Sequence, residues 1–182
     1  LLEFGPLWLV AIAAPAVLYG PHWAGLMSSL GLGGLLAGRL HFDKPVVLGG
    51  VGAAMVLAGL TLTTSRNVVG ITVAQIVLAV LVMAASIHVS RLLHDAVPST
   101  VRAGVASGVG ALSWITFLPF ALAFGLVSEK HGVHTAGWLI VAAAAVTGVL
   151  LAKVALRGRV PASAPAFIAL RAAGGHMQMI GD

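Results

Sequence analysis

The chain alternates long apolar stretches with short polar interruptions, and the interruptions divide it into six segments. A membrane-spanning helix needs about 20 mostly apolar residues. Cutting the sequence at its charged, proline and glycine positions predicts helices over residues 5–20, 22–40, 45–63, 67–90, 102–127 and 135–156. The first boundary rests on Gly20-Pro21-His22, because proline disfavours helix at the residue before it. One long bent helix over the first two segments is the alternative.

Composition places these segments in a membrane. Apolar residues make up 59% of the chain and charged residues 8%, and the mean hydropathy is +1.06. A soluble domain carries about 25% charged residues. The charged residues of this chain are too few to cover the surface of a soluble protein of its size. This excludes a soluble enzyme, a nucleic-acid-binding domain and a disordered chain. We therefore predict an all-α integral membrane protein with six transmembrane helices, followed by a polar cytoplasmic tail over residues 157–182.

The net charge of +5 comes from basic residues that gather in alternate loops. Only Arg66 and Lys130 fall on one side of the predicted helices, whereas eight basic residues fall on the other. Loops rich in Lys and Arg stay in the cytoplasm. The pattern therefore predicts a protein of the cell membrane with both termini cytoplasmic. The eight are Arg39, Lys44, Arg91, Arg102, Lys153, Arg157, Arg159 and Arg171.

Polar side chains are unevenly distributed among the predicted helices. Segments 45–63 and 135–156 have almost none, so we expect these two helices at the periphery. The other four face a cavity or a partner, because polar groups at membrane depth are costly elsewhere. This pattern indicates a 3+3 repeat with the third helix of each triplet outside. The candidates to line a substrate cavity are Tyr19, Ser28, Thr72, Gln75, Ser86, Trp114 and Thr116.

Two polar side chains of segment 67–90 each leave two interpretations open. Gln75 shares one helical face with Ala79 and Ser86, because three- and four-residue spacing places side chains on one side of a helix. It either forms an interhelical hydrogen bond or contacts a solute. His88 lies near the cytoplasmic end, where it either reaches the membrane interface or takes up a proton.

The aromatic residues and one proline suggest where the helices meet water and where they bend. Trp8, Trp23 and Trp138 lie near predicted helix ends and are candidates for the interfacial aromatic belt. Trp114 is too deep for that belt, so we expect it to face protein or a cavity. Pro119 interrupts the hydrogen bonds of its helix and predicts a kink.

Catalytic patterns are weak. Segment 105–108 is similar to the Gly-x-Ser-Gly motif of rhomboid proteases, but Val105 replaces the first glycine and His134 lies only at the edge of the last helix. The chain has no cysteine, and its acidic residues fall in predicted loops or tails. We therefore expect no enzyme, no cofactor and no metal site, with a rhomboid-like protease as a distant alternative.

The loops resemble those of the major facilitator superfamily. Residues 34–40, followed by a basic loop and Pro45, resemble the family's signature between the second and third helices of a six-helix half. Gly38 stands where that signature has an acid, and Asp43 is a possible substitute. Residues 97–104 resemble the loop before the fifth helix of a half. The residues of these loop and gating motifs are Gly34, Gly38, Arg39, Asp43, Pro98, Arg102 and Pro119.

The resemblance implies the C-terminal half of a twelve-helix secondary transporter, similar to drug-efflux members, that works by alternating access. Its expected partners are the lipid bilayer, a small solute, and either the missing N-terminal half or a second copy of the chain. No buried charge is evident, so we expect a neutral or amphipathic organic solute, with export as one possible direction. The alternative is a non-transport or accessory six-helix subunit of a larger complex, such as a permease subunit.

Overall fold

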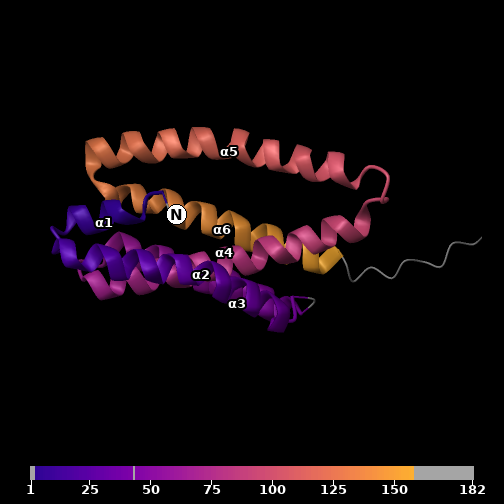
Figure 1. Ribbon diagram of the computed structural model, residues 1–182, viewed down its shortest axis with the longest axis horizontal. Coiled ribbons are helices and arrows are strands. Elements are labelled where there is room, and N and C mark those ends of the chain that lie inside the picture. The colour runs from indigo at the N-terminus through magenta and orange to yellow at the C-terminus, as the bar shows by residue number, and fades with distance from the viewer. Residues whose placement is uncertain (1–2, 43, 158–182) are drawn as a thin grey trace, which may run out of the picture.

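The computed structural model describes residues 3–42 and 44–157 of the chain, and this part is helical without strands. Figure 1 shows α2, α3, α4 and α6 as a bundle, with α5 set apart along one side. The predicted tail lies outside the described residues, except for Arg157 at the end of α6. The elements are α1 (Gly5–Ala11), the 3-10 turn η1 (Ala16–Leu18), α2 (Tyr19–Arg39), α3 (Pro45–Thr64), α4 (Val68–Ala96), α5 (Arg102–His131) and α6 (Val133–Arg157).

Four of these helices are long and apolar enough to cross a membrane: Pro45–Thr64, Val68–Ala96, Arg102–His131 and the part of α6 over Val133–Val154. Helix α2 has 21 residues but is not among the four. Its glycine, serine and histidine residues make it less apolar than the other long helices. Length and hydropathy together indicate a helical membrane protein.

The bundle is built from two closely packed helix pairs. Helix α3 packs along α6, α2 packs along α4, and α3 also lies against α4. Small residues allow the first pair to approach closely, since a methyl group built on Gly52 would come within 3.0 Å of the Cα atom of Gly148. Close backbone approach of this kind is typical of helices that associate in lipid. Helix α3 was expected at the periphery of the bundle. It supplies seven buried residues instead.

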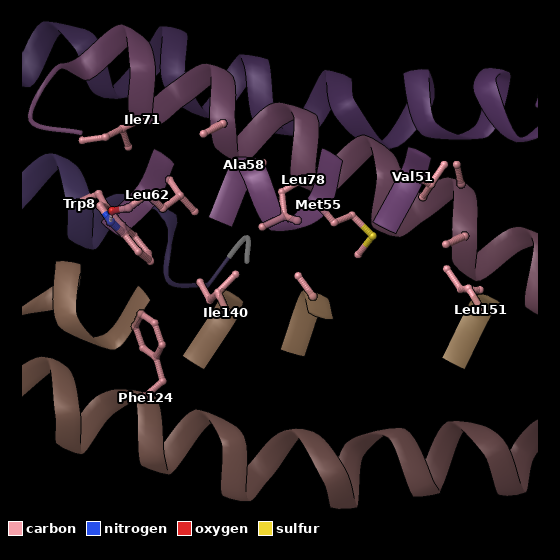
Figure 2. Close-up of a cluster of buried hydrophobic side chains, with 14 of the residues drawn as sticks. Trp8, Val51, Met55, Ala58, Leu62, Ile71, Leu78, Phe124, Ile140 and Leu151 are labelled. Atoms are coloured by element: carbon pink, nitrogen blue, oxygen red, sulfur yellow. Dashed lines mark hydrogen bonds between the residues drawn. The ribbon is translucent and has the colours of Figure 1, made fainter. Parts of the chain in front are cut away.

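The apolar core lies where α1, α3, α4, α5 and α6 meet, as Figure 2 shows. Trp8 lies at one end of this core, near Leu62 and Phe124, and is fully buried, so the prediction of an interfacial tryptophan is wrong at this position. Its indole Nε1–H donates a 2.8 Å hydrogen bond to the carbonyl oxygen of Leu62. Leu62 is in the last turn of α3, where carbonyl groups have no partner within the helix. The indole satisfies one of them from a neighbouring helix.

The segment predicted as one helix over residues 5–20 is interrupted after Ala11. Helix α1 has only seven residues, about 10 Å of helix, which is too short to span a membrane. Ala13 takes a left-handed backbone conformation with φ 50°. The amides of Ala13 and Ala14 donate to the carbonyls of Val10 and Leu9. This is the hydrogen-bond pattern of a Schellman helix end, here with alanine at the position that glycine usually occupies.

The proline expected to separate the first two helices lies inside α2. Pro21 is the third residue of α2, where its missing N–H has no helical acceptor to lose. Helices α4 and α5 run several residues beyond the predicted ends at 90 and 127, because charged side chains near a helix end are solvated without breaking the backbone pattern. Helix α5 also continues through Pro119.

Candidate functional site

A cavity of about 410 Å³ lies between α5 and the α2–α4 pair. Its size falls in the range of pockets for small organic ligands, about 300–1,000 Å³, and its wall is mostly apolar. Helices α2, α4 and α5 supply the wall together with one residue that precedes α1. The lining residues are Glu3, Leu30, Ala79, Val82, Met83, Ser86, Ser113, Trp114 and Phe117.

The cavity exists because α5 is anchored at only one end. Phe124 is the one fully buried side chain of α5 among the described residues. Its ring stacks on Phe4 at 4.4 Å and lies 5.7 Å from Trp8, as centroid distances. Beyond this aromatic cluster, α5 runs away from the bundle toward its N-terminal end (Figure 1). Gly132, with φ 84°, forms the tight connection from α5 to α6 at the anchored end.

A second, smaller cavity of about 140 Å³ lies deeper, among α3, α4, α5 and α6. Val82 lines both cavities. Of two neighbouring residues, Glu3 lines the larger cavity and Phe4 lines the smaller one. The two hollows therefore follow each other along the inner face of α5. The segment that precedes α1 borders both of them.

The predicted cavity residues divide into three groups. Ser86 and Trp114 line the larger cavity, together with Ala79 from the face of α4 that the sequence singled out. Ser28 and Thr116 are exposed and do not line it; their hydroxyls donate to the carbonyls of Ala24 and Leu112 in their own helices. Tyr19, Thr72 and Gln75 are half-buried or buried elsewhere.

A buried polar cluster joins α1, α2 and α4. Gln75 is fully buried and donates its side-chain Nε2 to the carbonyl oxygen of Gly5 at 3.2 Å. His22, which is 2% exposed, places Nδ1 3.0 Å from the hydroxyl of Thr72. Among the described residues, His22 Nε2 and Gln75 Oε1 are buried without a hydrogen-bond partner. Of the two interpretations of Gln75, the structure shows the interhelical hydrogen bond.

The residues of the loop motifs lie at one end of the bundle, apart from Pro119 within α5. Gly38 is exposed, and a methyl group built on Gly34 or Gly38 would meet nothing within 4 Å. The close contact of α2 with α4 is made by Gly33 instead, where a built methyl group would come within 2.6 Å of the Cβ of Met83. Gly34 and Gly38 therefore take no part in the close contact between α2 and α4.

The remaining motif residues are exposed or make contacts only with nearby residues of the chain. Arg39 is exposed in the last turn of α2, and Pro98 is exposed in the connection between α4 and α5. The guanidinium of Arg102 donates to the carbonyl oxygen of Val97 at 3.2 Å. Asp43 lies outside the described residues.

His88 lies near the C-terminal part of α4. Its ring stacks on that of Phe42 with centroids 4.7 Å apart. Nearby, the guanidinium of Arg91 donates to the carbonyl oxygen of Ala37, which fastens α4 to the end of α2. His88 does not line either of the two cavities beside α5.

The Ser–His pair of the protease hypothesis is not assembled. Ser107 lies in the second turn of α5, whereas His134 begins α6, so about 35 Å of helix separates them. His134 Nε2 lies instead 3.0 Å from the carbonyl oxygen of Ser65.

The sequence reasoning missed several lining residues. Glu3 was placed in a polar end, but it borders the larger cavity. Ser113 and Phe117 were missed as lining residues, although Phe117 lies three residues after Trp114 and four after Ser113 on α5, a spacing that places it on a face with each of them. His22 entered the sequence reasoning only as part of the Gly20-Pro21-His22 boundary, and its burial depends on contact with α4.

Comparison with known proteins gives no match: no protein-family model, no curated protein and no solved structure matches this chain.

Proposed function

We propose that the chain is one six-helix half of a secondary transporter, resembling the C-terminal half of a major facilitator superfamily protein, that moves a small organic solute by alternating access. The observation that supports this best is the cavity of about 410 Å³ between α5 and the α2–α4 pair. It is large enough for a small organic molecule and is bordered by helices that differ in how firmly they are held. An element anchored at one end is suited to changing access to a cavity.

Helix pairing supports the 3+3 arrangement. The third helices of the two triplets, α3 and α6, pack along each other. The fourth helix, α4, pairs with α2, and a repeat would pair α1 with α5 in the same way. The aromatic contacts of Phe4 and Trp8 with Phe124 lie at that position.

The exposed surface of α5 supports the need for a partner. Side chains such as Leu112, Ile115 and Leu118 are more than 60% exposed on this helix. A missing N-terminal half, or a second copy of the chain, would cover part of this surface and close the cavity from the other side. The proposed orientation places the connection between α2 and α3, and the C-terminal end of α6, in the cytoplasm.

Transport by the full chain in proteoliposomes tests this function. The probes are neutral amphipathic dyes and lipophilic cations loaded inside the vesicles, with and without an imposed ion gradient. We expect release that the cavity-filling substitution Ala79→Leu abolishes. Ala106→Leu is the matched control, because Ala106 is exposed on α5 and does not line the cavity.

Release equal to that of protein-free vesicles, from correctly inserted protein that cross-linking shows to be a dimer, would overturn the proposal of a transporter built from two copies of the chain. The accessory-subunit hypothesis would then account better for the exposed surface of α5. Equal release by the native chain and the Ala79→Leu variant would show that this cavity is not the route.

A further inference from the structure

We propose that a groove between α3 and α6 binds an anionic glycerophospholipid of the cytoplasmic leaflet. One acyl chain lies in the groove, and the phosphate lies at its end, near Lys44 and Lys153. The site goes beyond the proposed function and does not depend on transport. Three observations support it: the apolar groove itself, basic residues at one end of it, and a helix N-terminus at that end without a side-chain cap.

The groove has the chemistry and the length of an acyl-chain site. Its volume is about 530 Å³, and its lining consists only of glycine, alanine, valine and leucine. It follows α3 from Gly49 to Leu57 and α6 from Ala145 to Ala152. At 1.5 Å per residue the α3 side is about 12 Å long, close to the roughly 15 Å of one leaflet of the hydrocarbon core. A lining without polar side chains suits an acyl chain and offers nothing to orient a polar ligand.

The groove forms because α3 and α6 meet through glycine. A methyl group built on Gly52 would come within 3.0 Å of the Cα atom of Gly148, so backbone takes the place of side chains at the contact. Gly49, Ala53 and Ala145 line the groove and are exposed. The groove is therefore open on the surface of the bundle, where lipid can enter it from the membrane.

Both lysines lie at the same end of the groove. Helices α3 and α6 run antiparallel, and Figure 1 shows the start of α3 and the end of α6 at one end of the bundle. Continued from the contact of Gly52 with Gly148, the register places Lys153 level with Val47 in the first turn of α3. Lys44 immediately precedes that turn. The distribution of basic residues assigns this end to the cytoplasm.

The charge at this end suits a phosphate. Lys44 and Lys153 are exposed, and within the described part of the chain neither ammonium group forms a hydrogen bond or an ion pair. Helix α3 also begins without a side-chain cap and without an acidic residue in its first turn. The start of α4, at the opposite end, is capped by Asn67, whose side chain accepts a 2.8 Å hydrogen bond from the amide of Val69. The start of α3 thus lacks the acceptor that the start of α4 has.

An anionic headgroup supplies what this end lacks. A helix N-terminus carries a partial positive charge and attracts phosphate. Basic residues at the cytoplasmic ends of neighbouring membrane helices attract anionic headgroups in the same way. A zwitterionic headgroup would bring its own cation beside the two lysines, so the net charge of the lipid decides its affinity.

Fluorescence quenching by brominated lipid tests the inference. The chain has no cysteine, so Ala53→Cys places a single labelled thiol in the groove. The full chain is reconstituted in phosphatidylcholine with increasing fractions of brominated phosphatidylglycerol or brominated phosphatidylcholine, and the two quenching curves give the relative affinity. We expect phosphatidylglycerol to be preferred about twentyfold, because each of the two lysines contributes roughly fivefold near an anionic lipid.

Substitutions at the end of the groove test the headgroup position. Lys44→Gln and Lys153→Gln should each reduce the preference about fivefold, and the double variant should bring it close to one. Lys130→Gln is the matched control, because it removes an exposed basic residue from the opposite end of the bundle, in the last turn of α5. It should leave the preference unchanged.

Substitutions along the groove test the acyl chain. Gly49→Leu fills the groove and should reduce quenching by phosphatidylglycerol several-fold. Gly50→Leu is the matched control: a methyl group built on either glycine meets nothing within 4 Å, but only Gly49 lines the groove. Circular dichroism and gel filtration confirm that each variant is folded.

Equal quenching by the two brominated lipids, with both lysines present, would overturn the inference, because the groove would then hold lipid of any charge. Weak quenching by both, together with disulfide cross-linking of unlabelled Ala53→Cys between chains, would also overturn it and assign the groove to a second copy. A preference that survives in the double lysine variant would contradict the headgroup position. Dye release is a separate result: a chain that transports nothing can still show the lipid preference, and loss of the preference leaves the transporter proposal standing.

Discussion

The side-chain amide of Gln75 donates to the carbonyl oxygen of Gly5 at 3.2 Å, and this bond fastens the short helix α1 to α4, 70 residues further along the chain. The two residues immediately before Gly5 are Glu3 and Phe4, which line the larger and the smaller cavity. The anchoring of Gly5 therefore helps to fix the position of the only charged group that borders the larger cavity among the described residues. A polar contact buried in the bundle thus positions a residue of the candidate site.

Gly5→Ala tests how closely this cluster is packed. A methyl group at this position would lie 3.1 Å from Gln75 Oε1, 3.1 Å from the Cδ1 of Leu26 and 3.5 Å from His22 Nε2. We expect a loss of stability of about 1–2 kcal/mol, because extra volume in a packed site forces its neighbours to move. The measurement is the apparent melting temperature of the protein in nanodiscs.

Gly20→Ala is the control for that substitution. A methyl group there would meet nothing within 4 Å, and alanine favours helix over glycine. Its melting temperature should be unchanged or slightly higher. A drop of equal size in both variants would show that the contacts around Gly5 are not the cause.

Trp8→Phe tests the hydrogen bond between α1 and the end of α3. Phenylalanine keeps most of the ring but leaves the carbonyl oxygen of Leu62 buried without its indole donor. We expect a loss of about 1–3 kcal/mol, the usual cost of an unsatisfied buried polar group. Trp138→Phe is the control, because it makes the same substitution at a side chain that is 55% exposed. It should have little effect on stability. Thermal unfolding followed by circular dichroism compares the two.

Much of the fold could be predicted from the sequence, because hydropathy and length dictate where long helices form in a membrane. The starts of α3 at Pro45 and α5 at Arg102 agree with the predicted positions. The break after Ala11 could not be predicted in this way. Alanine favours helix, and its left-handed conformation at Ala13 depends on the hydrogen bonds that close the turn.

The candidate site was less predictable, because it depends on how the helices rotate about their axes. Composition identified Trp114 and Ser86 as polar or aromatic groups within helices, and both line the cavity. The same reasoning also named Thr116 as a candidate, although its side chain does not line the cavity. Glu3 could not be found from local sequence, since its position depends on the packing of α1 against α4 and α5.

Gly52→Ala tests whether close backbone approach holds α3 to α6. The added methyl group would lie 3.0 Å from the Cα of Gly148, and backbone cannot move aside as a side chain can. We expect a loss of about 1–3 kcal/mol. Gly50→Ala in the same helix is the control, because nothing lies within 4 Å of its built methyl group. Unfolding of both variants in the same nanodiscs gives the comparison, and equal stability would contradict this account of the pair.

The orientation of the bundle can be measured because the chain has no cysteine. Lys44→Cys introduces one thiol at the end of the bundle where α3 begins, and Arg66→Cys introduces one at the opposite end, between α3 and α4. A bias of basic residues toward the cytoplasm predicts that a membrane-impermeant maleimide labels Arg66→Cys in intact cells and labels Lys44→Cys only after the membrane is opened. The reverse pattern would invert the proposed topology. It would also place the connection between α4 and α5, with Pro98, on the outer side.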